Sequence, residues 1–420
     1  MTPPGVSMVP TPELPVTLAD IESAARTIEG KVVRTPLIAA PRFPGLPDVP
    51  IYLKLENLQR TGAFKLRGAT NRLAQLTSEE AKRGVITASA GNHAQGVAWA
   101  ARARGVPATI VMAENASPLK VSLTRALGAR VILHGSDYDE AHDHSVRLGE
   151  EEHLTYVHPY DDRFVIAGQG TVGLEILDEL PDARRIVAGV GGGGLLSGIA
   201  AAVRGRGSTA DVVGVQPKGA DNLRPSLAEG RVILGGRPAT FADGLATRQI
   251  GDLPFQILKA AGARAFTADD RTIARASFLL LEQAKVLAEG AGATPLAGLL
   301  EHAELTADGP VVLVVSGGNL DPFLLDRILF IGLAAEGRLL RLRASLRDLP
   351  GRLEEFLSVA ASEGANVRHI LHGRESPDRP PGEVTVEVEL EVRDAAHGEA
   401  VEAAYRQRGW ATARVPLGPT

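Results

Sequence analysis

The chain has 420 residues, of which 44% are hydrophobic and 23% are charged. That length suffices for two or three domains with large cores, and the composition is typical of a folded globular protein. A net charge of −5 and an aromatic content of 4% provide little phosphate attraction and few rings for base stacking, so nucleic acid is not expected as a partner. The lack of Cys excludes disulfides, thiolate nucleophiles and cysteine-held metals, and it is compatible with a cytoplasmic location.

Residues 1–16 are rich in Pro and have neither the basic nor the apolar region of a secretion signal, so we expect a flexible tail. From there to about residue 330, apolar β-branched runs alternate with amphipathic stretches such as 70–76 and 92–104. The runs that we predict as strands are 85–87, 108–112, 131–133, 186–190, 212–215 and 311–315. Apolar strands separated by helices indicate parallel sheets covered on both faces, so the predicted fold class is α/β.

The segment 186–203 has no charged residue and thereby imitates a membrane span. Five of its first nine residues are Gly, and each Gly inside a helix costs about 1 kcal/mol relative to Ala. We therefore predict a strand, a loop and a helix in this segment, and we expect no membrane partner.

The pattern changes after Gly337. Strand patterns at 339–346, 367–371 and 383–392, and a short one ending near 415, are interrupted by helical patterns at 353–360 and 395–408. The order βαββαβ predicts a separate α+β domain over residues 337–420.

Lys65 follows a Thr-Gly turn and stands next to Phe64. Only eight of the 45 cationic residues are Lys, so this chain uses Arg where a general positive charge is enough. Because Arg cannot form a Schiff base and because desolvation lowers a lysine pKa, Lys65 is a candidate reactive amine. The alternative is an ordinary amphipathic helix start whose lysine reaches into solvent.

Residues 185–198 predict a strand that feeds a tetraglycine turn, Gly191 to Gly194, at the start of a helix. Glycines let backbone N–H groups approach an anion, and the helix N-terminus adds a favourable dipole, so this loop predicts a phosphate site. Tight packing of the strand on the helix is one alternative. A dinucleotide site is another, but the next strand ends in Gln216 rather than in the carboxylate that binds ribose.

Two further polar turns follow predicted strands. In residues 89–96 the backbone N–H groups are candidates for binding a substrate carboxylate, although Ser89 or Asn92 can instead cap the next helix. In residues 316–319, Ser316 ends a buried strand and points to the crevice where open α/β sheets bind ligands.

Together these segments resemble the fold type II pyridoxal-phosphate enzymes, and among them the threonine ammonia-lyase (threonine dehydratase) family. The similarity extends from about residue 17 to residue 333. It is carried by the motifs at residues 59–68, 89–96, 158–161, 167–170, 191–194 and 316–319. The resemblance implies a two-lobed catalytic unit, in which residues 17–56 and 158–333 form the large lobe and residues 57–157 form the small lobe.

The resemblance also implies the role of each site residue. Lys65 would hold pyridoxal 5'-phosphate covalently, Phe64 would pack near its ring, and Asn92 would bind its ring hydroxyl. Ser316 would face the pyridine nitrogen, where a neutral hydroxyl favours elimination over transamination. The phosphate would be bound by Gly191, Gly192, Gly193 and Gly194, and the substrate carboxylate by Ser89, Ala90, Gly91, Asn92 and His93.

The implied activity is the deamination of L-threonine to 2-oxobutanoate and ammonia by β-elimination of the hydroxyl, with L-serine giving pyruvate by the same route. Lys65 would take the α-hydrogen as the base. Alternatives are a related dehydratase of serine or hydroxyaspartate, a racemase, and a non-catalytic amino-acid sensor. Related serine racemases have a second Ser where this chain has Ala90, which cannot move a proton, so racemisation is disfavoured.

Relatives that need a divalent cation place carboxylates after the strand at 212–215, whereas this chain has Gln216 and Asn222 there, with Asp221 alone. We therefore predict no tightly bound divalent metal at that place. Five of the ten histidines lie in residues 134–158, but the surrounding Asp and Glu favour an exposed acidic segment over a metal site.

The tail after Gly337 resembles an ACT-like regulatory domain, in which Asp348 to Gly351 form the loop where such domains often bind an amino acid. Feedback by isoleucine is one implied role, and a purely structural dimerisation module is the alternative. We expect an exposed apolar face and free sheet edges to pair subunits side by side, which gives a homo-oligomer, a dimer or a tetramer.

Overall fold

The computed structural model describes residues 14–306, 309–374 and 380–417. The chain divides into two compact units, one ending at Asp321 and one beginning at Pro322. Residues 1–13 of the predicted tail lie outside the described residues. Val16, at the end of that predicted tail, is fully buried in the core, so the packed part of the chain begins before Thr17.

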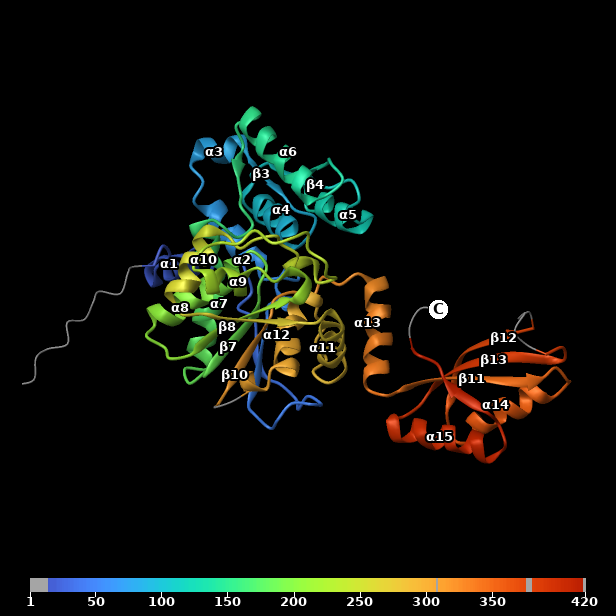
Figure 1. Cartoon of the computed structure of the whole chain (residues 1–420). Coiled ribbons are helices and arrows are strands. Elements are labelled where there is room, and N and C mark those ends of the chain that lie inside the picture. Colours follow the sequence, from blue (N-terminus) through green and yellow to red (C-terminus); the bar gives the residue numbers. More distant parts are fainter. Residues whose placement is uncertain (1–13, 307–308, 375–379, 418–420) are drawn as a thin grey trace, which may run out of the picture. The chain divides into compact units, whose positions relative to one another are not determined.

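A six-stranded sheet forms the centre of the large lobe (Figure 1). Its strand order is β1-β2-β10-β7-β8-β9, and every neighbouring pair is parallel except β1 with β2. The strands are β1 (Leu37–Ala39), β2 (Ile51–Leu55), β7 (Arg185–Gly189), β8 (Asp211–Pro217), β9 (Arg264–Ala268) and β10 (Val311–Val315). β7 and β10 are buried along their whole length, as expected of central parallel strands between helical layers.

Helices cover this sheet. They are α1 (Leu18–Ile28), α7 (Arg163–Glu179), α8 (Gly194–Gly205), α9 (Leu223–Glu229), α10 (Asp252–Ala260), α11 (Asp270–Glu282) and α12 (Gly290–Glu301). The charge-free segment 186–203 forms β7, the glycine loop and α8, as predicted. Within the part of the chain that the structure describes, no helix has both the length and the apolar character needed to cross a membrane.

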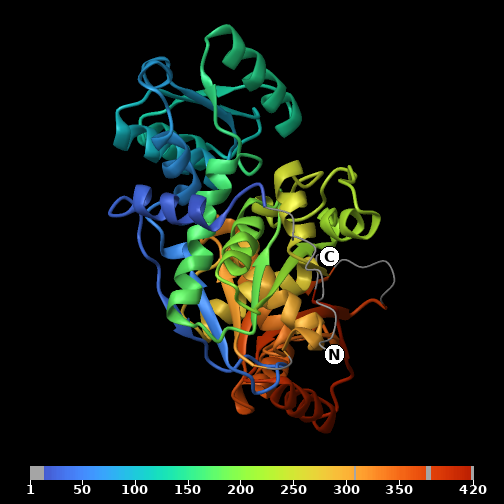
Figure 2. The same cartoon turned by 90° about the vertical axis from the view of Figure 1, so that its left-hand side faces the viewer.

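A second, smaller parallel sheet has the strand order β5-β4-β3-β6. Its strands are β3 (Val85–Ala88), β4 (Ala108–Met112), β5 (Arg130–Leu133) and β6 (Thr155–Tyr156). The helices α3 (Ser78–Arg83), α4 (Asn92–Arg104), α5 (Pro118–Ala126) and α6 (Tyr138–Glu151) accompany it. Both views show these elements gathered at one end of the first unit, away from the six-stranded sheet (Figures 1 and 2).

Helix α2 (Lys65–Ala74) is fixed against α7, and α7 against α8, by facing glycines. A Cβ added to Gly168 would lie 2.7 Å from Cα of Gly68, and one added to Gly198 would lie 2.6 Å from N of Gly170. Gln169 accepts a 3.2 Å hydrogen bond from the backbone N–H of Gly68. The motif at residues 167–170 therefore holds α2, the helix that begins with Lys65, against the large lobe.

The second unit contains α13 (Pro322–Ala335), although the sequence analysis assigns most of this helix to the large lobe. The elements β11 (Leu339–Arg347), α14 (Arg352–Ser362), β12 (Asn366–Gly373), β13 (Glu383–Glu391), α15 (Ala395–Gln407) and β14 (Thr412–Arg414) follow it. They have the predicted βαββαβ order and form one antiparallel sheet, β12-β13-β11-β14.

The apolar face of this antiparallel sheet is not exposed, so that expectation is wrong. Val386 and Val388 are fully buried with Phe356 of α14 and Tyr405 of α15, because the two helices pack on this face. The opposite face carries cross-strand ion pairs such as Arg343–Glu387. β12 is an edge strand that is exposed along almost its whole length.

The α/β fold class, the fold type II arrangement of parallel sheets and the small C-terminal α+β domain are thus confirmed. The sequence missed the short or partly exposed strands β1, β2, β6 and β9, of which β1 has three residues and β6 two.

Candidate active site

Lys65 begins α2, and its side chain is only partly exposed. Its Nζ donates a 2.7 Å hydrogen bond to the carbonyl oxygen of Pro159 and lies 5.2 Å from the centre of the Phe64 ring. Burial lowers the pKa of Lys65 to about 8. An amine with this pKa is uncharged in a substantial fraction of molecules near neutral pH, and only the uncharged form is a nucleophile or a base.

The tetraglycine loop lies between β7 and α8, with Gly193 as the N-cap of α8 in a left-handed conformation of φ +91°. A Cβ at Gly193 would lie 2.7 Å from Ile250, and a Cβ at Gly191 would lie 3.0 Å from the carbonyl oxygen of Gly244. Because Gly193 has no side chain, it cannot cap the first N–H groups of the helix, which remain suited to an anion.

Tyr160 joins the lysine to this loop. It follows Pro159, the acceptor of the Lys65 hydrogen bond, and its ring covers Gly192 so closely that a Cβ there would collide with it. A Cβ at Gly194 would lie 3.0 Å from Cα of Tyr160. The amine and the glycine loop therefore border one space, as the sequence analysis requires.

The backbone next to Pro159 is held by a neutral histidine. Nδ1 of His158 accepts hydrogen bonds from the N–H groups of Tyr160 at 3.3 Å and Asp161 at 2.7 Å. Burial lowers the pKa of His158 to about 4, which keeps this nitrogen an acceptor at neutral pH. The Asp161 carboxylate in turn accepts from the N–H groups of Asp252 and Leu253 at the start of α10. The motif at residues 158–161 thus shapes the backbone beneath the Lys65 amine.

Asn92 takes part in a chain of side-chain hydrogen bonds. Its Nδ2 donates to Oε1 of Glu289 at 2.6 Å, and its Oδ1 accepts from Nδ2 of Asn319 at 2.8 Å. Burial raises the pKa of Glu289 to about 7, although the hydrogen bond from Asn92 opposes that shift. The sequence analysis missed Glu289. The available signal was a carboxylate at the start of a glycine-rich helix that is otherwise apolar.

The turn before Lys65 runs beside the loop that follows β10. The N–H of Phe64 donates to the carbonyl oxygen of Ser316 at 3.1 Å, and the N–H of Gly318 donates to the carbonyl oxygen of Gly62 at 2.9 Å. Ser316 itself is buried. The structure therefore brings together the lysine motif and the serine motif, although about 250 residues separate them in the chain.

The residues proposed to bind the substrate carboxylate form the start of α4. Gly91 is its N-cap, and the N–H of Gly91 donates to Oγ of Ser89 at 3.1 Å. Among the described atoms, none lies within 4 Å of a Cβ added to Gly91, so the space beside it is open. His93 turns away, because its Nε2 lies 3.0 Å from the carbonyl oxygen of Val157. Ala90 packs at the edge of the small-lobe core.

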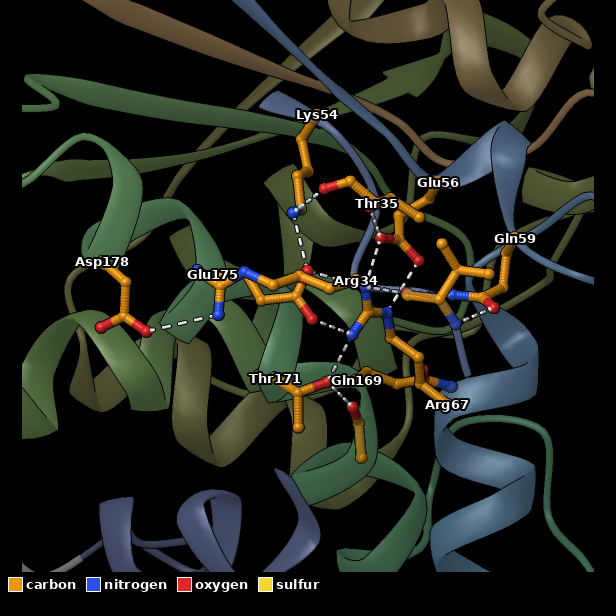
Figure 3. Close-up of polar contacts among 12 residues, drawn as sticks. Arg34, Thr35, Lys54, Glu56, Gln59, Arg67, Gln169, Thr171, Glu175 and Asp178 are labelled. Carbon is orange, nitrogen blue, oxygen red and sulfur yellow. Dashed lines mark hydrogen bonds and ion pairs between the residues drawn. The ribbon is translucent and has the colours of Figure 1, made fainter. Parts of the chain in front are cut away.

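A buried network of charges holds α2 from the side opposite the site residues named above (Figure 3). The guanidinium of Arg67 pairs with Glu56 at 2.8 Å and with Glu175 at 2.6 Å, and Lys54 pairs with Glu175 at 2.7 Å. Thr35 donates to Glu56 at 2.5 Å. Burial alone would lower the pKa of Arg67, but the two carboxylates outweigh it and raise that pKa. Two cations and two anions balance, so the network is neutral overall.

The structure gives Gln216 and Asn222 a local role. Nε2 of Gln216 donates to Oδ1 of Asn222 at 3.1 Å, and Oε1 of Gln216 accepts from the N–H groups of Asn222 and Leu223. Of the histidines in residues 134–158, His134 and His144 stack with ring centres 3.9 Å apart. In the described residues, no group of three or more His, Asp or Glu side chains is arranged to hold a metal ion.

These residues fit pyridoxal phosphate. A desolvated primary amine suits its aldehyde, and a helix start whose four glycines leave no room for a Cβ suits its phosphate. Asn92 retains one amide hydrogen that neither Glu289 nor Asn319 uses, and this hydrogen suits a ring hydroxyl.

Comparison with known proteins agrees with this fit. The model of the family described as "Pyridoxal-phosphate dependent enzyme" matches residues 28–317. The L-threonine ammonia-lyase of Thermotoga maritima is 44% identical over 396 residues, which cover 94% of this chain and 98% of that protein. A match of that length must extend into the second unit.

Two solved structures are similar to the catalytic unit. A bacterial threonine deaminase, designated T.th., has a TM-score of 0.69 and 39% identity, and the match covers 73% of this chain and 99% of that one. Maize serine racemase has a TM-score of 0.71 and 33% identity, with 76% and 98% covered. The chain therefore belongs to the family of pyridoxal-phosphate dependent enzymes, as its sequence motifs predicted, and its cofactor is pyridoxal phosphate.

Proposed function

We propose that this protein deaminates L-threonine to 2-oxobutanoate and ammonia, and L-serine to pyruvate, by β-elimination of the hydroxyl. The observation that carries the proposal is the Lys65 amine, which has a lowered pKa and borders the same space as the glycine loop. The name of the Thermotoga maritima relative, L-threonine ammonia-lyase, supports threonine as the substrate.

Each residue has a stated task in this reaction. Lys65 holds the cofactor through Nζ, and Nζ also accepts the α-hydrogen of the substrate. The N–H groups of Gly191 to Gly194 bind the phosphate, and Phe64 packs near the ring. The N–H groups at the start of α4, from Ser89 through Ala90, Gly91 and Asn92 to His93, orient the substrate carboxylate.

Bound pyridoxal phosphate supplies the electron sink that makes the α-hydrogen acidic. Ser316 presents a neutral hydroxyl to the pyridine nitrogen, so this nitrogen gains less positive charge than beside a carboxylate. Negative charge at the α-carbon is then held less strongly, which favours early loss of the β-hydroxyl and disfavours transamination.

The test is to add L-threonine to the purified full-length protein, to follow 2-oxobutanoate, and to compare Lys65→Ala. We expect the variant to lose several orders of magnitude in rate, because the covalent attachment and the base are removed together. Lys82→Ala, on the exposed surface of α3, is the control and should leave the rate unchanged. Near-normal turnover by Lys65→Ala would exclude the proposed chemistry.

The same assay separates the alternatives. Comparing turnover of threonine, serine and hydroxyaspartate identifies the preferred hydroxy amino acid. Racemisation is the second candidate because of the similarity to maize serine racemase. Ala90 offers no group that could carry a proton to the opposite face of the substrate, so we expect no D-serine from L-serine.

We also propose that the second unit is an ACT-like regulatory domain, that the protein is a cytoplasmic homo-oligomer, and that isoleucine is the feedback effector. The βαββαβ order and the exposed edge strand β12 support this proposal. In a titration, deamination should slow as isoleucine rises. A constant rate up to millimolar isoleucine would remove the feedback proposal and favour a structural pairing module.

A further inference from the structure

We propose that Glu289 is a positioning residue, whose carboxyl oxygen holds the side-chain amide of Asn92 in the one orientation that leaves an N–H for the cofactor. This inference rests on the proposed role of Asn92 in binding the ring hydroxyl. It adds a residue that the sequence motifs do not contain and that does not itself need to touch the cofactor.

The hydrogen bonds around Asn92 specify which way its amide faces. On one side Glu289 provides an acceptor 2.6 Å from Nδ2, and on the other side Asn319 provides a donor 2.8 Å from Oδ1. A rotation of the amide by 180° would oppose two acceptors on the first side and two donors on the second. The observed orientation is therefore the one that both neighbours favour.

Glu289 is itself held in place. It is the residue before α12, and its backbone N–H donates to the carbonyl oxygen of Gly317 at 3.1 Å. A Cβ at Gly317 would collide with Oε1 of Glu289, so only Gly allows the carboxyl to reach Asn92. Asn319 is anchored as well, since its Nδ2 also donates to the carbonyl oxygen of Thr61 at 2.8 Å.

The charge on Glu289 is not what this arrangement uses. Among the described residues, no lysine or arginine forms an ion pair with Glu289. The charged groups that act on it are Lys120 and Asp243, which pair with each other at 3.0 Å and so largely cancel. Oε1 accepts from Asn92 whether or not Oε2 carries a proton. A neutral carbonyl oxygen at the same place should therefore work equally well.

The experiment compares Glu289→Gln with Glu289→Ala in the full-length protein. The dissociation constant of pyridoxal phosphate is measured by fluorescence titration after removal of the cofactor, and the absorption band of the rebound cofactor is recorded. Loss of one hydrogen bond at the Asn92 amide should weaken cofactor binding by Glu289→Ala about tenfold and shift the band. Glu289→Gln should stay within about twofold of the wild type.

Two further variants separate this positioning role from general stability. Glu301→Ala removes a carboxylate from the other end of α12 and should leave cofactor binding unchanged. In an Asn92→Ala background, Glu289→Ala should have no further effect on the dissociation constant, because Glu289 acts through Asn92. This comparison remains valid when Glu289→Ala lowers the melting temperature, since both backgrounds share that loss.

Three results would overturn the proposal: wild-type cofactor binding by Glu289→Ala, equal weakening by Glu289→Gln and Glu289→Ala, or additive effects of the Glu289 and Asn92 variants. Wild-type binding by Asn92→Ala alone would instead reject the proposed role of Asn92. The two failures are therefore distinguishable.

Discussion

The Nζ of Lys65 and the carbonyl oxygen of Pro159 lie 2.7 Å apart, within the small space that the ring of Tyr160 and the glycine loop also border. This hydrogen bond points the amine out of the start of α2 and toward the loop that precedes α7. A backbone carbonyl is a neutral acceptor, so it orients the amine without the attraction by which a carboxylate would raise its pKa. The site thereby keeps a lysine that is both aimed and easily deprotonated.

The first prediction concerns the titration of this amine. In the cofactor-free protein, Lys65 should react with an acylating reagent with a midpoint near pH 8, because burial lowers its pKa to about 8. Mass spectrometry of the labelled peptides over pH 6 to 11 measures the midpoint. Exposed Lys82 in the same sample serves as the reference, and a Lys65 midpoint no lower than that of Lys82 would contradict the prediction.

The second prediction concerns the glycine loop. Gly192→Ala should weaken cofactor binding and destabilise the protein by about 1–3 kcal/mol, because the new methyl group would collide with the Tyr160 ring. Urea unfolding and a cofactor titration check both effects. Gly236→Ala is the matched control, since none of the described atoms lies within 4 Å of a Cβ there. Equal behaviour of the two variants would show that the loop tolerates side chains.

The third prediction concerns the buried charges around α2. Arg67→Met should cost about 3–5 kcal/mol of the free energy of unfolding, because Glu56 and Glu175 would lose their shared cation. Arg67→Lys should recover only part of this, since an ammonium group cannot bind two carboxylates in bidentate geometry.

The control for Arg67 is Arg231→Ala, which removes an exposed ion pair with Glu229 and should change stability by less than about 1 kcal/mol. Chemical denaturation of the three variants gives the comparison. A loss for Arg67→Met as small as the loss for Arg231→Ala would mean that the buried pairs add little to stability.

The fourth prediction concerns pH. The pKa of Glu289 is raised to about 7 in the folded protein, above its ordinary value of 4.5, so ionisation is harder in the folded state than in the unfolded one. The stabilising effect of its proton is complete below about pH 4.5 and is lost as the pH rises through 7. Glu289→Gln, which cannot ionise, should therefore gain stability relative to the wild type over this interval. Denaturation curves at several pH values measure the difference, and a difference independent of pH would refute the raised pKa.

The sequence predicted the centre of each sheet well. The strands at 108–112 and 311–315 match β4 and β10 to the residue, because strands buried on both faces are continuously apolar. β2 was missed because it contains Lys54, whose charge is compatible with full burial only through Glu175 of a distant helix. Such long-range compensation leaves no local pattern.

The candidate site was predictable wherever side chains or glycines carry the chemistry, as at Lys65 and the glycine loop. The carbonyl oxygen of Pro159 was not, since every residue has one and only the fold selects it. Glu289 was missed for a related reason. It lies about 200 residues from Asn92 in the chain, and one acidic residue before a helix is ordinarily interpreted as favourable for the helix dipole.

The pairing of β2 with β10 has a consequence for biosynthesis. The two strands are about 260 residues apart, whereas all four strands of the smaller sheet lie between residues 85 and 156. At about 5–20 residues per second, a ribosome that has released β2 works for roughly ten to fifty seconds before β10 can join it. The small lobe can assemble during that wait, while the apolar residues of β2 have no permanent neighbour. Nascent chains of this enzyme should therefore need shelter from chaperones mainly at the segment around residues 51–55, until the last strand of the large lobe emerges.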